Sequence, residues 1–119
     1  MRNSLPISIL LLVLLLTSGQ ASADARKDYQ RGLEAYRDGD LVEAADYMKR
    51  SADKGYLKAQ VELAGMYLRG EGVDEDAGNA ASWYLKAARQ GDAAAQYQLA
   101  QLYREGKGVR EDATRANRW

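Results

Sequence analysis

The sequence contains no cysteine and no histidine, and these two absences remove most familiar catalytic and metal-binding chemistry. Without cysteine there is no thiol nucleophile, no disulfide and no thiolate metal ligand. Without histidine the chain also lacks the side chain that most often serves as general base and metal ligand. We therefore expect a protein that is not an enzyme and that holds no cofactor or metal.

Phenylalanine is also absent and proline occurs once, whereas alanine is abundant and there are 11 glycines and 8 tyrosines. Closely approaching helices joined by glycine turns suit this composition better than a sheet does. Neither charge sign is in excess, because 17 Lys and Arg residues balance 17 Asp and Glu residues. That balance argues against a nucleic-acid partner. The expected fold class is all-α, in one domain.

A long apolar run is missing everywhere except near the N-terminus, where residues 9–16 are apolar throughout. Arg2 contributes positive charge before this run, and Ala21, Ser22 and Ala23 follow it. A basic start, an apolar centre and a small-x-small motif are typical of a signal peptide.

The apolar run is too short to span a bilayer. It has 8 residues, or 12 if it is counted from Leu5, and a spanning helix needs roughly 20. We predict that residues 1–23 are cleaved off and that residues 24–119 are exported with no membrane span. The periplasm is the favoured location, secretion is the second, and a retained membrane anchor is the rival interpretation of residues 1–23.

Most of the remaining chain repeats itself at an offset of 36 residues, beginning with Ala59-Gln60 and Ala95-Gln96. Repeats of about 20 to 50 residues are typical of stacked units that bury their apolar faces against one another. The sequence therefore predicts a solenoid. Other pairs at this offset are Leu63 with Leu99, Ala64 with Ala100, Tyr67 with Tyr103, Gly70-Glu71-Gly72-Val73 with Gly106-Lys107-Gly108-Val109, and Trp83 with Trp119.

Each repeat carries two apolar stripes at helical spacing, which predict an A helix followed by a B helix. Trp83 lies in the middle of a B stripe, in a helix expected over residues 76–90, and we expect its ring to be buried. The A stripes are Ala59, Leu63, Met66 and Tyr67, then Ala95, Leu99, Leu102 and Tyr103; the B stripes are Ala44, Tyr47, Met48, Ser51 and Ala52, then Ala80, Trp83, Tyr84, Ala87 and Ala88.

Polar residues and glycines mark the expected helix ends. Asp40 and Glu43 predict a capping box, while Asp76 and Asp112 are predicted N-caps. The glycines that follow the B helices are expected in the left-handed conformation, and these are Gly55 and Gly91.

Residues 59–73 read A-Q-x-x-L-A-x-x-Y-x-x-G-x-G-V, and residues 76–91 read D-x-x-x-A-x-x-W-Y-x-K-A-A-x-x-G. This pattern resembles the Sel-one-like repeat. Upstream, Gly32 precedes Ala44 by 12 residues, whereas Ala64 precedes Ala80 by 16. The earlier hairpin therefore has a shorter turn and resembles an ordinary tetratricopeptide unit.

The resemblance implies a right-handed α-solenoid of helical hairpins. We expect a tetratricopeptide-like hairpin over residues 24–55, a Sel-one-like hairpin over residues 56–91, and an incomplete Sel-one-like hairpin over residues 92–119.

Two local motifs imitate ligand sites. The glycine turns at Gly70 and Gly106 lack the preceding strand and the G-K-[ST] motif of a phosphate loop, so we interpret them as turns. The acidic residues from Glu71 to Asp76 have the wrong spacing for a calcium loop, because Gly78 occupies a ligand position. Capping and the helix dipole already favour carboxylates at a helix N-terminus, so these residues need no metal ion to explain them.

The A helices carry a further face, opposite their apolar stripes. In tetratricopeptide-like stacks the A helices line the concave surface, so the resemblance implies a binding site for a protein or an extended peptide. Basic side chains beside tyrosine suit a segment that bears carboxylates. The rival interpretation is an ordinary solvated helix face. The expected partner-binding residues of this A-helix face are Lys58, Val61, Leu68, Arg69, Tyr97, Gln101 and Arg104.

These features favour an exported helical-repeat adaptor that mediates protein–protein interaction through its concave A-helix face. A subunit permanently assembled into a cell-envelope or secretion complex is the alternative. An enzyme comes third, because no nucleophile and base are paired in the sequence.

Overall fold

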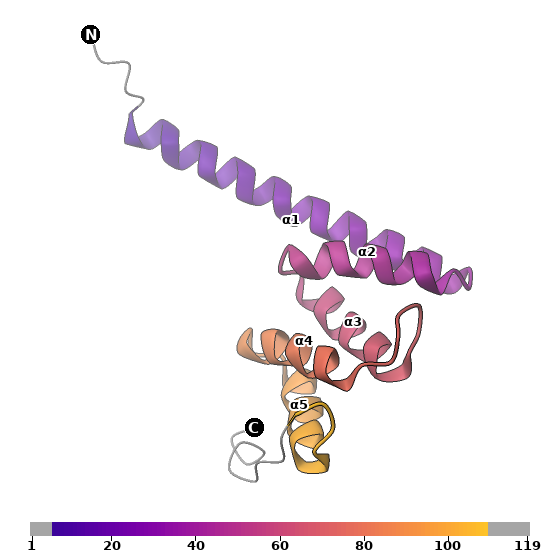
Figure 1. The fold of residues 1–119 in the computed structure, drawn as a ribbon. Coiled ribbons are helices and arrows are strands. Elements are labelled where there is room, and N and C mark those ends of the chain that lie inside the picture. Colours follow the sequence, from indigo (N-terminus) through magenta and orange to yellow (C-terminus); the bar gives the residue numbers. More distant parts are fainter. Residues whose placement is uncertain (1–5, 110–119) are drawn as a thin grey trace.

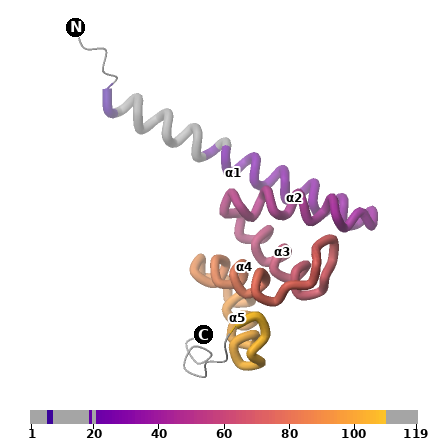
Figure 2. The backbone as a smooth tube through the Cα atoms, viewed as in Figure 1, coloured from indigo at the N-terminus to yellow at the C-terminus, as the bar shows by residue number. Residues whose placement is uncertain are grey.

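The computed structural model describes the backbone of residues 6–109 and the side chains of residues 6, 7, 19 and 21–109, and over residues 6–109 the chain forms five helices and no strand. Each helix packs against the next one along the chain (Figure 1). The helices are α1 (Ile7–Arg37), α2 (Leu41–Asp53), α3 (Leu57–Arg69), α4 (Ala77–Arg89) and α5 (Ala93–Glu105). The tube through the Cα atoms shows them stacked in chain order from α1 to α5 (Figure 2). The predicted all-α solenoid is confirmed.

The first helix starts before the predicted cleavage site and continues through it. Ala25 is the first side chain of the described residues to be buried, and Ser51 Oγ donates a hydrogen bond of 2.6 Å to its carbonyl oxygen. Lys54 Nζ lies 2.7 Å from Asp28 Oδ2. Among the residues described, no helix is both long enough and apolar enough to cross a membrane.

Two aspartates cap the helices that follow them. Asp76 Oδ1 accepts a hydrogen bond of 3.0 Å from the backbone N–H of Asn79, as predicted, and Asp92 Oδ2 accepts one of 2.8 Å from Ala95. These bonds satisfy N–H groups that have no partner within the helix. The other predicted cap, Asp112, lies outside the described residues.

The predicted capping box at Asp40 and Glu43 is wrong. Asp40 precedes α2, but its side chain makes no capping hydrogen bond. Its φ of −83° and ψ of 72° are those of an inverse γ-turn, in which the Leu41 N–H donates to the Gly39 carbonyl at 3.0 Å. The short first turn therefore uses a backbone bond where the turns before α4 and α5 use a carboxylate.

Two glycines end the B helices as predicted, with positive φ angles of 89° at Gly55 and 92° at Gly91. The second glycine of each longer turn is more constrained. A Cβ at Gly72 would lie 2.0 Å from the Leu41 carbonyl oxygen, and one at Gly108 would lie 2.2 Å from the Ala77 carbonyl carbon. Each longer turn therefore seats its backbone directly against the start of the preceding B helix.

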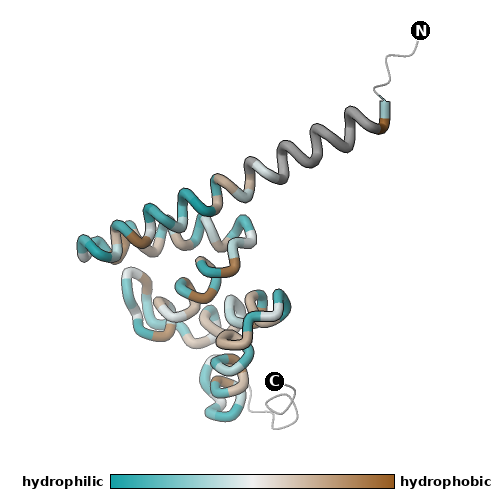
Figure 3. The backbone as a smooth tube through the Cα atoms, turned by 180° about the vertical axis from the view of Figure 1, so that it is seen from behind, coloured by the Kyte–Doolittle hydropathy of each residue, from teal (hydrophilic) through white to brown (hydrophobic). Residues whose placement is uncertain are grey.

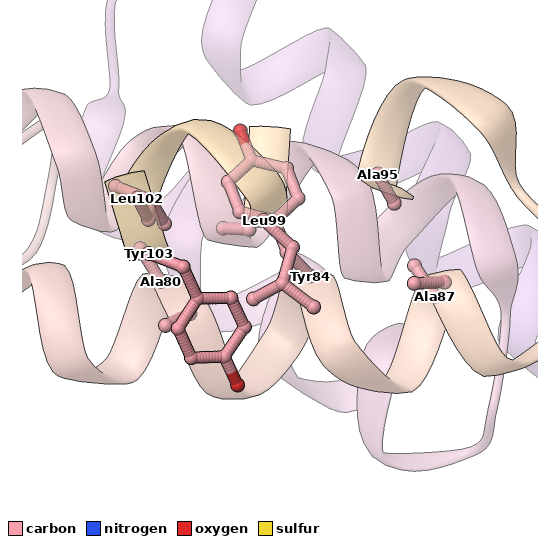
Figure 4. Packing of buried hydrophobic residues seen from close by; sticks show 10 residues of the cluster. Ala80, Tyr84, Ala87, Ala95, Leu99, Leu102 and Tyr103 are labelled. Carbon is pink, nitrogen blue, oxygen red and sulfur yellow. The ribbon is translucent and has the colours of Figure 1, made fainter. Parts of the chain in front are cut away.

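Small side chains let the helices approach closely, and the buried core is rich in alanine. It forms two clusters, one around Met48 and Leu63 and the other around Tyr84 and Leu99, part of which is seen in Figure 4. Hydrophilic and hydrophobic residues alternate along the stacked helices, as amphipathic helices require (Figure 3).

Trp83 departs from the expected burial. Its ring packs against both clusters but is only half-buried. Lys86 Nζ lies 4.1 Å from the ring centroid. The indole therefore lies at the edge of the joint between hairpins, where the lysine ammonium covers it, rather than inside an alanine-lined core.

The Ala-Gln pair of the repeat holds successive hairpins together. Gln60 Nε2 donates to the Ala52 carbonyl at 3.2 Å, and Gln96 Nε2 donates to the Ala88 carbonyl at the same distance. Each glutamine thereby adds a donor to a carbonyl near the C-terminal end of the preceding B helix, which also accepts from the backbone N–H of Gly55 or Gly91.

Candidate partner-binding surface

The predicted partner-binding residues lie on the two A helices of the longer repeats, α3 and α5. Lys58, Arg69 and Arg104 are exposed. Val61 and Leu68 are half-buried and pack against the cluster around Tyr84 and Leu99. These two side chains therefore offer a partner only part of their surface.

The three predicted residues of α5 form one connected group. Arg104 Nη1 donates to Gln101 Oε1 at 2.6 Å, and Gln101 Nε2 donates to the Tyr97 hydroxyl at 3.3 Å. Tyr97 is 62% exposed. The central amide thus orients a guanidinium on one side and a phenol on the other, and both point to a surface that a partner can reach.

Arg69 of α3 has a different environment. Its Nε donates to Glu71 Oε1, and the other carboxylate oxygen accepts a hydrogen bond of 2.6 Å from the Tyr36 hydroxyl of α1. The guanidinium folds back over Gly65, where a Cβ would lie 2.9 Å from Arg69 Nη1. This group connects α1, α3 and the turn after α3.

The hydrogen bonds of this group change the acidity of its members. Donation by Tyr36, and then by Arg69, lowers the pKa of the Glu71 carboxyl below its ordinary value. The same hydrogen bond to Glu71 raises the pKa of the Tyr36 hydroxyl. Glu71 therefore stays ionised at neutral pH and compensates the charge of Arg69.

Sequence reasoning missed two members of this surface, Tyr36 and Glu71. The sequence analysis assigned no partner contact to Tyr36 and placed Glu71 only in the acidic turn. A signal for Tyr36 was available: aligning Gly32 with Ala64 places Tyr36 at the position of Leu68, which is on the A-helix face. Glu71 accepts a hydrogen bond from Tyr36, 35 residues earlier in the chain. This contact depends on how the turn folds, so sequence spacing alone does not predict it.

A hollow lies between α2, Tyr67 of α3 and the turn before α4. Its volume is about 720 Å³, and Val42 at its edge is 67% exposed. We call it the outer hollow. Among residues 6–109 no group of three or more acidic residues is placed to hold a metal ion. The hollow is lined by Val42, Asp46, Lys49, Tyr67, Gly72, Val73, Asp74, Asp76 and Asn79.

Comparisons with solved structures give the same architecture. A protective antigen of uropathogenic Escherichia coli with an SLR fold, c5321, superposes with a TM-score of 0.75 at 35% sequence identity, over 88% of this chain and 23% of that one. A Sel1 repeat protein from Oxalobacter formigenes superposes with a TM-score of 0.68 at 32% identity, over 77% of this chain and 37% of that one. This chain thus spans well under half of either neighbour.

No curated protein matches the sequence. The family model of the Sel1 repeat matches residues 23–56, 57–92 and 93–119. The second and third matches begin at the starts of α3 and α5, so each of these repeats opens with an A helix. The Sel1 family consists of helical repeats that generally mediate protein interactions. On this evidence, the chain belongs to the Sel1 repeat family.

Proposed function

We propose that this protein is an exported adaptor that captures a protein partner on its A-helix face. The partner contributes an extended segment that carries at least one carboxylate. No catalytic step is part of the proposal.

The exposure of aromatic side chains on the A helices carries the proposal. The large hydrophobic side chains exposed among the described residues are Ile7, Tyr36, Val42 and Tyr97. Two of them, Tyr36 and Tyr97, lie on A helices, and Gln101 links Tyr97 to Arg104. Tyrosine and arginine are the residue types that contribute most often to binding hot spots.

Export is supported by where the tertiary contacts of α1 begin. Among the described residues, the hydrogen bonds of α1 with α2 and its C-cap, Lys54, start at Ala25 and Asp28, just after the predicted cleavage site that follows Ala23. Ala21, Ser22 and Asp24 are exposed. Cleavage at that site would leave these contacts intact. Mass spectrometry of protein recovered from the cell envelope tests this, and an intact N-terminus there would contradict it.

Capture of a partner is tested by pull-down from a cell-envelope extract. The variant carries Tyr97→Ala and Arg104→Glu, which remove the aromatic ring and reverse the charge of the α5 group. We expect it to lose the partner while its unfolding free energy changes by only about 0.5 kcal/mol per surface site.

The matched control carries Arg50→Glu and Arg89→Glu, two exposed arginines of the B helices α2 and α4. It should retain the partner. Loss of the partner by the control but not by the α5 variant would contradict binding at the A-helix face.

The alternative, a permanently assembled subunit, is favoured by one observation, the exposed Val42 of the outer hollow. Permanent interfaces are large and apolar. Val42→Asp would then release the protein from its complex, whereas the adaptor proposal expects unchanged capture.

A further inference from the structure

The two arginines of the A-helix face have different electrical environments, and this difference bears on the partner. Arg69 donates to a carboxylate, that of Glu71, whereas Arg104 donates to a neutral amide, that of Gln101. An arginine held by a carboxylate has most of its charge compensated. One held by an amide keeps a full charge for a partner.

The carboxylate at Glu71 also opposes a second anion. A partner carboxylate placed on Arg69 would lie close to Glu71, where like charges repel each other. The hydroxyl of Tyr36 already occupies the other oxygen of Glu71. Arg69 is thus part of a closed group that ties α1 to the turn after α3.

No carboxylate of the residues described accepts a hydrogen bond from Arg104. Its neighbour along the chain, Glu105, lies 3.3 Å from Lys107 Nζ. Gln101 uses its oxygen for Arg104 and its amide N–H for Tyr97, so this amide orients the guanidinium without neutralising it. The exposed ring of Tyr97 supplies apolar surface next to it.

Resting on the proposed function, we infer that the A-helix face binds a single carboxylate of an extended peptide at Arg104, beside an apolar peptide side chain on Tyr97. Tyr97 and Arg104 are seven residues apart on one helix, about 10 Å at 1.5 Å per residue. An extended peptide covers that distance in about three residues. The peptide therefore carries its apolar and acidic residues within about three positions of each other. Arg69 is a structural tie and takes no partner carboxylate.

A phage-displayed library of random peptides, selected on the purified protein, tests this inference. We expect the recovered peptides to share one acidic position close to an apolar one. For a recovered peptide, Arg104→Gln should weaken binding about 10- to 100-fold, the range of a charge-assisted hydrogen bond. Arg69→Gln should change it by less than about threefold.

Glu71→Gln is the decisive variant, because it gives Arg69 the same neutral neighbour that Arg104 has. Selection on this variant should yield peptides with a second acidic position. Circular dichroism and melting confirm that each variant is folded.

The outcomes separate the two proposals. If the wild type recovers no peptide, peptide capture itself fails and the assignment of Arg104 fails with it. If peptides are recovered without an acidic position, or if Arg69→Gln weakens binding more than Arg104→Gln does, peptide capture stands and the assignment of Arg104 is overturned.

Discussion

The joints between hairpins and the A-helix face differ in how closely they repeat. At the joints, Gln60 and Gln96 donate to equivalent carbonyls, and Gly72 and Gly108 approach equivalent backbone. At the same offset on the A-helix face the residues change, from Val61 to Tyr97, from Gly65 to Gln101 and from Leu68 to Arg104. Positions that repeat their contacts hold the stack together, and we propose that the positions that vary distinguish partners.

The largest loss of stability is expected for Gly72→Ala. The residue has a φ of 71°, and the added Cβ would meet the backbone of Leu41 at 2.0 Å. Left-handed strain of about 1–2 kcal/mol and overpacking of about 1–3 kcal/mol together lower the unfolding free energy by about 2–5 kcal/mol. Chemical denaturation measures the loss.

Gly91→Ala is the matched control, because its φ is 92° but nothing lies within 4 Å of its Cβ position. It should lose only the strain, about 1–2 kcal/mol. Equal losses in the two variants would show that the turn after α3 does not need its close approach to α2.

Trp83→Ala comes next. Full burial would predict a loss of about 3–5 kcal/mol, but the ring is half-buried, so we expect about 2–3 kcal/mol. Lys86→Ala removes only the ammonium over the ring and should cost about 0.5–1 kcal/mol. Thermal melts of both variants check the order, and a loss in Trp83→Ala no larger than in Lys86→Ala would contradict the packing of Trp83 against both clusters.

Gln60→Ala tests the inter-hairpin hydrogen bond. The substitution removes the hydrogen bond from Gln60 Nε2 to the buried carbonyl of Ala52. It also removes the hydrogen bond of 2.7 Å that Gln90 Nε2 donates to Gln60 Oε1. We expect a loss of about 1–3 kcal/mol. Gln98→Ala, at an exposed position of α5, should stay within about 0.5 kcal/mol. Similar urea midpoints for the two variants would argue that the Ala-Gln motif does not hold the hairpins together.

The helices of the longer repeats and their ends were largely readable from the sequence, because each of them is local or periodic. The helix from Ala77 to Arg89, its Asp76 cap and the positive φ of Gly91 follow from spacing and turn chemistry. The half-burial of Trp83 and the turn at Asp40 do not, since both depend on how neighbouring hairpins approach each other. The same holds for the site: Tyr97, Gln101 and Arg104 share one helix, whereas the link of Arg69 to Tyr36 needs the folded turn.

The smallest expected effect is the pH dependence of Glu71. Its pKa is lower in the folded protein than in the unfolded chain, because Tyr36 and Arg69 donate to the ionised form. Its contribution to stability is therefore complete above about pH 4.3, the unfolded value, and is lost as the pH falls through the folded value. Because the group is near the surface, we expect less than about 1 kcal/mol. The test is to follow unfolding from pH 7 downward: wild type should lose stability more than Glu71→Gln, and parallel curves would contradict the link.

Recognition of the partner at the A-helix face is measured most directly by chemical-shift mapping of the isotope-labelled protein, titrated with a peptide recovered from the display selection. If the varying positions recognise the partner, the largest changes will fall on Tyr97, Gln101 and Arg104, while the outer hollow around Val42 and Asp46 stays unchanged. Changes concentrated around Val42 and Asp46, with α5 unaffected, would contradict recognition at the A-helix face.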